Sequence, residues 1–307
     1  MKWKGVMPAI TTCFNNDLSI DYHFMEDHCR WLLDNGCTGI VALGSLGEGA
    51  TLAFDEKLAI LRTCVKAVHG RGPVVAAISA LSTSEAVSLA KAAADLGCDG
   101  LMVLPPYVYK GDWREMRTHV AAVCNATSLS CMLYNNPVAY GTDFLPEQIR
   151  ELAAEHENLA AVKESSTDVR RVSAIRALLD QRLEICVGVD DAVLEAIGVG
   201  ATGWIAGLAN ALPRESVELF NYGINGGADK AFELYRWFLP LLRMDTVPNF
   251  VQLIKLVQAE VGIGNSRVRP PRLELVGKEL AHNREIIRDA LQARPHSVSS
   301  FALPSGK

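Results

Sequence analysis

The residue with the clearest chemical potential is a lysine that directly follows a short apolar run. Leu159-Ala160-Ala161-Val162 precedes Lys163, and Glu164-Ser165-Ser166 follows it. Apolar surroundings weaken the preference of an amine for its charged form, so Lys163 could attack a carbonyl carbon as a nucleophile. The alternative is a strand-end lysine that pairs with Glu164 and faces water. The local sequence leaves both interpretations open.

A glycine-rich segment offers a second kind of chemistry. Gly44-Ser45-Leu46-Gly47-Glu48-Gly49 follows the apolar run 40–43. Three glycines within six residues allow backbone N–H groups to converge on a carboxylate or phosphate, and Ser45 adds a hydroxyl to that seat. The alternative is a plain tight turn between a strand and a helix.

Two tyrosines stand at the ends of other apolar runs. Tyr134 follows Met132-Leu133 and is followed by Asn135-Asn136-Pro137. A hydrogen-bonded phenol at such a position can transfer protons, although amphipathic packing is the commoner role. Tyr107 follows Pro105-Pro106, and the two prolines predict an extended exit from which its side chain projects.

Composition excludes several classes of function. Thirty basic and thirty-five acidic residues give a net charge of -5 without any basic run, so we expect neither nucleic acid nor a membrane surface as a partner. The eight cysteines form no CxxC pair, and we expect buried, reduced thiols in a cytoplasmic protein. The seven histidines lack metal-ligand spacing, and the GxGxxG match at 198–203 precedes a strand instead of opening a helix. We therefore expect no metal ion and no cofactor.

Short continuous apolar runs alternate with amphipathic ones along the first two thirds of the chain. Continuous apolar runs are typical of parallel strands buried on both faces. The predicted strands begin near Gly5, Thr38, Pro73, Gly100, Leu129, Leu159, Leu183 and Thr202. Between them helices are predicted at 21–35, 55–69, 83–96, 112–125, 145–156, 168–179 and 190–199, with caps at Asp55, Thr83, Asp112, Asp168 and Asp190. The alternation favours an α/β fold, a (β/α)8 TIM barrel, over an open doubly wound sheet.

The pattern changes after about residue 213. Further helices are predicted at 214–222, 228–243, 246–261 and 278–293, and no further strand is predicted. We therefore expect a barrel domain at 1–225, a C-terminal helical module at 226–294 and a mobile tail at 295–307. In such a barrel the active site lies at the carboxyl ends of the strands, where Lys163, Tyr134 and Ser45 all fall. An amine, a phenol and a hydroxyl beside an anion seat suit Schiff-base chemistry on a 2-oxo acid or its cyclic imine.

The same residues carry a resemblance to a known superfamily. From Gly5 to Ala293 the chain resembles the dihydrodipicolinate synthase and N-acetylneuraminate lyase superfamily of class I aldolases. The matching motifs are Gly44-Ser45-Leu46-Gly47-Glu48, Tyr134-Asn135-Asn136-Pro137, Lys163-Glu164 and Gly203-Trp204-Ile205. The resemblance implies that Lys163 forms the imine, that Tyr134 transfers protons and that Ser45 relays them. It further implies that Tyr107 completes the relay across a dimer interface within a homotetramer, a dimer of dimers.

Two departures from the superfamily pattern bear on the substrate. Leu46 replaces the second hydroxyl of the carboxylate seat, so only its backbone N–H can serve there, while Ile205 is implied to lie beside the bound oxo acid. Ala139 stands where the lysine-pathway synthases place an arginine that holds a second carboxylate.

The C-terminal sequence narrows the resemblance. The stretches 234–242 and 268–272 resemble 1-pyrroline-4-hydroxy-2-carboxylate deaminases, a branch tied to hydroxyproline degradation. We therefore expect a small 2-oxo acid or cyclic imino acid as substrate. The alternatives are a 4-hydroxy-tetrahydrodipicolinate synthase or another pyruvate-dependent aldolase, and, outside enzymes, an idle barrel that serves as a scaffold.

Overall fold

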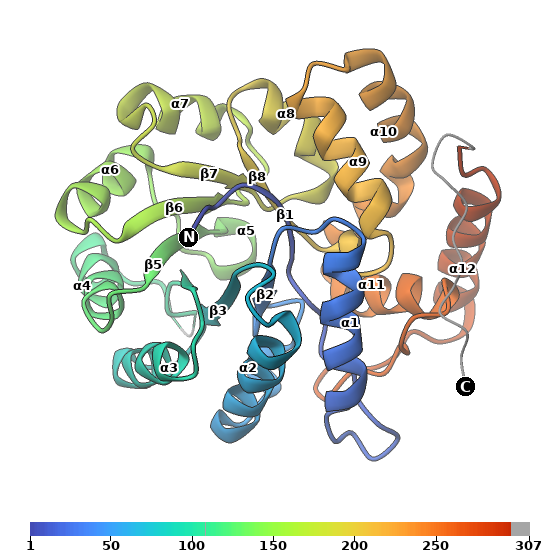
Figure 1. The fold of residues 1–307 in the computed structure, drawn as a ribbon, viewed down its shortest axis with the longest axis horizontal. Coiled ribbons are helices and arrows are strands. Elements are labelled where there is room, and N and C mark those ends of the chain that lie inside the picture. The colour runs from blue at the N-terminus through green and yellow to red at the C-terminus, as the bar shows by residue number, and fades with distance from the viewer. Residues whose placement is uncertain (108, 296–307) are drawn as a thin grey trace.

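A computed structural model describes residues 1–107 and 109–295, and its centre is a barrel of eight parallel strands (Figure 1). β1 pairs with β8, and the order continues from β8 back through the sheet to β2. A parallel bridge between Ala9 and Val41 joins the end of β1 to β2 and closes the circle. The predicted (β/α)8 barrel is confirmed. The strands are β1 (Gly5–Pro8), β2 (Ile40–Ala42), β3 (Val74–Ile78), β4 (Gly100–Val103), β5 (Ser130–Asn135), β6 (Leu159–Glu164), β7 (Glu184–Val187) and β8 (Gly203–Ala206).

The strands are buried on both faces because helices cover the outside of the barrel (Figure 1). Each strand begins within two residues of its predicted start, since the apolar runs that build a two-sided core are continuous. The outer helices are α1 (Tyr22–Asp34), α2 (Phe54–Val68), α3 (Thr83–Asp95), α4 (Trp113–Cys124), α6 (Pro146–Glu155), α7 (Arg170–Leu179) and α8 (Val193–Gly198).

The predicted helix caps are only partly right. Asp112 caps α4 and accepts a hydrogen bond from the Glu115 N–H. α3 is capped by Ser82 and not by Thr83, and Asp55 lies inside the first turn of α2. Asp190 caps no helix, because its carboxylate accepts hydrogen bonds from β8 and the segment after it.

The C-terminal helices gather on one side of the barrel, coloured orange to red in Figure 1. They are α9 (Pro213–Ile224), α10 (Ala228–Leu242), the 3-10 turn η4 (Arg243–Asp245), α11 (Phe250–Glu260) and α12 (Gly277–Gln292). The helix predicted from residue 246 begins instead at Phe250. No strand follows β8 within the described residues, as predicted. The domain boundary at 225 stays a prediction, and the expected mobile tail lies, apart from Pro295, outside the described residues.

Two further observations concern the described chain as a whole. All eight cysteines are buried free thiols. None of the helices described is both long and apolar enough to cross a bilayer.

Candidate active site

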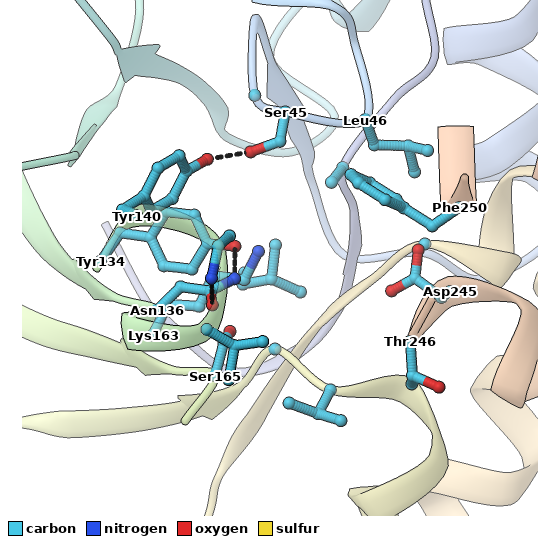
Figure 2. A pocket seen from close by; sticks show the side chains of 18 of the residues that line it. Ser45, Leu46, Tyr134, Asn136, Tyr140, Lys163, Ser165, Asp245, Thr246 and Phe250 are labelled. Atoms are coloured by element: carbon cyan, nitrogen blue, oxygen red, sulfur yellow. Dashed lines mark hydrogen bonds between the residues drawn. The ribbon is translucent and has the colours of Figure 1, made fainter. Parts of the chain in front are cut away.

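A cavity of about 500 Å3 lies at the carboxyl ends of the strands (Figure 2). Its walls come from the loop after β2, from β5, β6 and β8, and from η4 and the segment after it. Five of the six predicted site residues line it: Ser45, Leu46, Tyr134, Lys163 and Ile205. Tyr107 does not line this cavity.

Lys163 is buried at the base of the cavity, with only 6% of its surface exposed. Burial lowers the pKa of its amine, while the nearby Asp245, Tyr140 and Asp190 raise that pKa. The alternative of a water-exposed pair with Glu164 is wrong, because the Glu164 carboxylate accepts hydrogen bonds from Asn135 Nδ2 and from the Ser166 N–H.

Gly188, the first residue after β7, makes room for this lysine. A Cβ atom at position 188 would lie 2.3 Å from Lys163 Cε, well inside van der Waals contact. A side chain here would therefore displace the amine from the cavity.

Tyr134 is the neighbour of Lys163 on β5, and the two residues are paired in the sheet register. Lys163 Nζ lies 4.1 Å from the centroid of the Tyr134 ring. The Tyr134 hydroxyl accepts a hydrogen bond from Asn136 Nδ2 at 3.0 Å. Burial raises the pKa of the phenol, so Tyr134 keeps its proton and can donate it.

Tyr140 is a site residue that the sequence did not reveal. It ends the one-turn helix α5 (Pro137–Tyr140), which Asn136 caps by accepting a hydrogen bond from the Ala139 N–H at 2.9 Å. The Tyr140 hydroxyl forms a hydrogen bond with Ser45 Oγ, and its ring meets that of Tyr134 edge-on with centroids 5.7 Å apart (Figure 2). Burial raises the pKa of Tyr140 as well. The only local signal for this residue is the Asn-Pro pair that starts α5.

Tyr107 packs behind this tyrosine pair. Its ring centroid lies 6.0 Å from that of Tyr140 in the same chain. Tyr107 therefore contacts the cavity-lining residue Tyr140 but does not line the cavity itself. The predicted contact with a second subunit remains a prediction.

The glycine-rich loop, whose residues Ser45 and Leu46 line the cavity, contains unused hydrogen-bond donors. The loop is held by bonds from the Glu48 N–H to Ser45 O and from the Gly49 N–H to Gly44 O. Within the part of the chain that the structure describes, the N–H groups of Ser45, Leu46 and Gly47 have no acceptor. Successive backbone N–H groups without acceptors are the kind of donors that bind anions in proteins.

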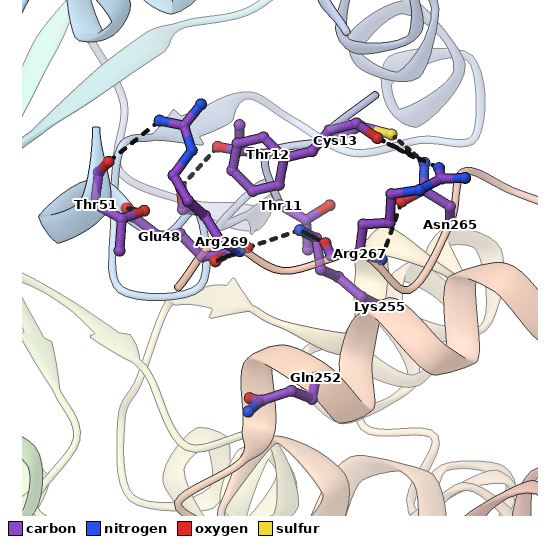
Figure 3. Close-up of polar contacts among 12 residues, drawn as sticks. Thr11, Thr12, Cys13, Glu48, Thr51, Gln252, Lys255, Asn265, Arg267 and Arg269 are labelled. Carbon is purple, nitrogen blue, oxygen red and sulfur yellow. Dashed lines mark hydrogen bonds and ion pairs between the residues drawn. The ribbon is translucent and has the colours of Figure 1, made fainter. Parts of the chain in front are cut away.

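The loop is anchored from below by a buried ion pair (Figure 3). Lys255 of α11 donates to Glu48 Oε1 at 2.7 Å, and the Arg269 N–H donates to Glu48 Oε2 at 3.0 Å. Glu48 takes a left-handed backbone conformation with φ of 56°, which turns its side chain inward. Lys255 Nζ also lies over the Phe14 ring at 4.5 Å. Lys255 of α11 and the backbone of Arg269 thus hold the glycine-rich loop in place.

Two carboxyl groups, those of the buried Asp190 and the half-buried Asp245, act electrostatically on Lys163. Asp190 accepts hydrogen bonds from Trp204 Nε1 at 2.8 Å and from the Leu208 N–H at 2.7 Å. Burial raises its pKa to about 6, although these donors lower it. Asp245, the last residue of η4, lines the cavity itself. Neither role follows from the sequence pattern, because Asp190 looks like a helix cap and Asp245 lies between two predicted helices.

Across residues 1–107 and 109–295, no group of three His, Cys, Asp or Glu side chains gathers where it could hold a metal ion.

The barrel, with its buried lysine at the carboxyl end of β6, has the architecture of a class I aldolase. A model of the Dihydrodipicolinate synthetase family matches residues 2–290. The chain belongs to this family, whose members are Schiff-base lyases of the class I aldolase type.

Relatives and solved structures agree with this assignment. The 4-hydroxy-tetrahydrodipicolinate synthase of Caldicellulosiruptor saccharolyticus is 32% identical over 94% of this chain and 96% of its own. The dihydrodipicolinate synthase of Bacillus anthracis superposes with a TM-score of 0.90 at 27% identity, over 94% and 98% of the two chains. The chloride-inhibited synthase of Acinetobacter baumannii complexed with pyruvate gives 0.89 at 28%, over 95% and 98%. These names support the synthase alternative better than the deaminase.

Proposed function

We propose that Lys163 forms a Schiff base with C2 of a 2-oxo acid or of its cyclic imine. The observation that carries this proposal is the buried Lys163 amine beside the Tyr134 phenol in a cavity with a free N–H seat. A related structure holds pyruvate, the simplest 2-oxo acid of this kind. The N–H groups of Ser45, Leu46 and Gly47 would hold the carboxylate, and Ile205 would pack beside the carbon chain.

The residues divide the proton transfers between them. The neutral Lys163 amine attacks C2, and Tyr134 donates a proton to the departing oxygen or ring nitrogen. Ser45 and Tyr140 are hydrogen-bonded to each other and lie beside Tyr134, so they can return a proton to its phenolate.

Within this class the site residues favour the 1-pyrroline-4-hydroxy-2-carboxylate deaminase reaction. Lys163 adds to C2 of the cyclic imine, the iminium acidifies C3, and the enamine expels the C4 hydroxyl as water. Tautomerisation then converts C5 into an imine carbon, and hydrolysis of the two imines releases ammonia and 2,5-dioxopentanoate, with one water consumed overall. This substrate carries a single carboxylate, and Ala139 supplies no second clamp on the cavity wall.

A second candidate is 4-hydroxy-tetrahydrodipicolinate synthesis, which the names of the relatives favour. One structural observation also supports it. Arg272 lines the cavity, and no carboxylate among the described residues pairs with its guanidinium. An arginine from the C-terminal module could replace the one missing at Ala139 and hold the carboxylate of aspartate semialdehyde.

Borohydride trapping followed by a substrate screen tests the proposal. Purified enzyme is reduced in the presence of pyruvate, and intact mass and peptide mapping locate the adduct. We expect one adduct per chain, on Lys163; an adduct elsewhere, or none, would overturn the Schiff-base proposal and leave a scaffold role. Turnover is then compared for the cyclic hydroxy imine, for aspartate semialdehyde with pyruvate, and for sialic acid. The preferred substrate decides between the two candidates.

We further propose that the protein is a cytoplasmic homotetramer, a dimer of dimers, in which Tyr107 lies near a subunit interface. The half-buried Tyr107 ring beside Tyr140 supports this placement, since an interface there would complete the wall behind the relay. Sedimentation velocity should give four subunits, and Tyr107→Trp fluorescence should change on dilution. A monomer at all concentrations contradicts this assembly.

A further inference from the structure

Asp245 occupies the cavity wall that faces the tyrosines. Figure 2 shows its carboxyl group pointing into the cavity from the side opposite Tyr134 and Tyr140. It is the last residue of η4, so it belongs to the C-terminal helices and not to a barrel strand. No hydrogen bond or ion pair occupies this carboxyl group within the described residues. The group is therefore available to a bound molecule.

A glycine directly after β8 leaves space for this carboxyl group. A Cβ atom at Gly207 would lie 2.1 Å from Asp245 Oδ1 and 2.5 Å from its Cγ, so only glycine leaves room there. The Gly207 N–H itself donates to Asp190 at 3.1 Å, so both carboxyl groups lie next to Gly207. Glycine at position 207 therefore leaves room for the Asp245 carboxyl group where it lies.

This environment favours the protonated form of Asp245. Burial and, secondarily, the neighbouring Asp190 hold the pKa of Asp245 well above its usual range, against the opposing effect of Lys163. A protonated carboxyl group can donate a hydrogen bond and then its proton. The tyrosines and Ser45 all lie on the other wall, so among the carboxyl and phenol groups of the described cavity residues Asp245 is the one that faces a leaving group on this side.

We propose that Asp245 is the catalytic acid that protonates the departing hydroxyl at C4 of the substrate. The inference rests on the proposed elimination reaction. The enamine electron pair forms the C3–C4 double bond, the C4–O bond breaks, and the proton of the Asp245 carboxyl group leaves with that oxygen as water. Asp245 remains as a carboxylate next to the Lys163 iminium, and it recovers a proton from solvent before the next turnover. The C-terminal helices thereby take part in the chemistry.

A competing role for Asp245 is that of a counter-ion, which would only tune the charge of Lys163. The two roles differ in their dependence on the leaving group. A hydroxyl group needs a proton to depart, whereas chloride does not. A catalytic acid is therefore essential for the 4-hydroxy imine and dispensable for its 4-chloro analogue, while a counter-ion affects both substrates alike.

The experiment compares wild-type enzyme, Asp245→Asn and the control Asp191→Asn. Asp191 is a half-buried neighbour that pairs with Arg243 outside the cavity. For Asp245→Asn we expect undiminished borohydride trapping of pyruvate, a loss of at least about 100-fold in kcat with the 4-hydroxy imine, and a change below threefold with the 4-chloro imine. Asp191→Asn should behave as wild type on both substrates.

Equal losses of Asp245→Asn on both imines, or a shifted pH midpoint of pyruvate trapping with parallel losses, would overturn the acid role in favour of the counter-ion. Full activity of this variant on the 4-hydroxy imine would overturn both roles. Failure of the proposed function looks different. In that case the wild-type enzyme itself gives no adduct, or forms the adduct without eliminating water.

Discussion

Lys163 and Tyr134 are paired residues on adjacent parallel strands, and the lysine Nζ lies 4.1 Å from the centroid of the tyrosine ring. Both side chains therefore start from backbone positions that the sheet register fixes. A nucleophile and its proton donor held by strands need less reorganisation during the reaction than a pair held by loops. The conformational changes during the reaction are therefore expected mainly in the substrate.

Replacing Lys163 tests the nucleophile directly. Lys163→Ala should abolish turnover and the borohydride adduct, because no other lysine lines the cavity among the described residues. Lys163→Arg should be equally inactive, since a guanidinium stays protonated and cannot attack a carbonyl carbon. Intact mass and circular dichroism measure the adduct and the fold. Turnover by a correctly folded Lys163→Ala variant would contradict this prediction.

The tyrosines should differ in importance. Tyr134→Phe should lose roughly 100-fold or more in kcat but still form some adduct, because it removes a positioned proton donor. Tyr140→Phe should lose more activity than Tyr107→Phe, since Tyr140 and not Tyr107 is hydrogen-bonded to Ser45 in this chain. Ser45→Ala should be milder than Tyr134→Phe, because the N–H seat survives. Steady-state kinetics on the preferred substrate gives the order, and a larger loss for Tyr107→Phe would point to a relay through another subunit.

Arg272 should affect only substrates with a second anionic group. Arg272→Ala should leave pyruvate trapping unchanged and raise the KM for aspartate semialdehyde at least about tenfold, because a charge-assisted hydrogen bond is lost. The cyclic imine should show little change. Arg288→Ala, which alters an exposed arginine on α12, serves as the control. An equal change in KM for both substrates in Arg272→Ala would show that the guanidinium does not bind the second carboxylate.

The buried ion pair below the glycine-rich loop should dominate local stability. Lys255→Met leaves the Glu48 carboxylate buried without its cation and should lower the free energy of unfolding by about 3–5 kcal/mol. The double variant Glu48→Gln, Lys255→Met should recover much of that loss. Lys66→Met, which breaks the exposed pair with Glu26, should change stability little. Urea titrations of the four proteins test this order, and a double variant no more stable than the single one would contradict it.

His28 should make stability depend on pH. Its Nε2 lies 3.1 Å from Asn210 Oδ1, and burial lowers its pKa from 6.5 to about 4. In the unfolded chain His28 becomes protonated below about pH 6.5, whereas in the folded chain it stays neutral down to about pH 4. The free energy of unfolding therefore decreases as the pH falls from about 6.5 towards 4. At pH 5 the wild type should be about 2 kcal/mol less stable than at pH 7.5 through this group alone.

The matched variants isolate that contribution. His28→Gln should remove this part of the pH dependence of the urea unfolding free energy. His23→Gln, which alters an exposed histidine on the same helix, should retain it. Identical pH dependences in the wild type and His28→Gln would refute the prediction.

The parts of the site that the sequence could predict are those attached to strands. Lys163, Tyr134 and Ser45 each follow an apolar run, and a barrel brings all such run ends together, so local pattern and fold class were sufficient. Tyr140, Asp245 and Arg272 follow no strand. They reach the cavity through α5 and through the packing of the C-terminal helices on the barrel, which is set by contacts between distant segments. The local sequence pattern around these three residues therefore does not predict that they line the cavity.

The bond between Glu48 and Lys255 spans 207 residues of sequence and has a consequence for synthesis of the chain. All eight strands leave the ribosome before the residue that anchors the substrate loop has been made. A nascent chain can thus close its barrel while its anion seat is still unsupported. Activity should appear late, as an all-or-none property of the finished polypeptide, and a product released before residue 255 would be a barrel that cannot hold a carboxylate.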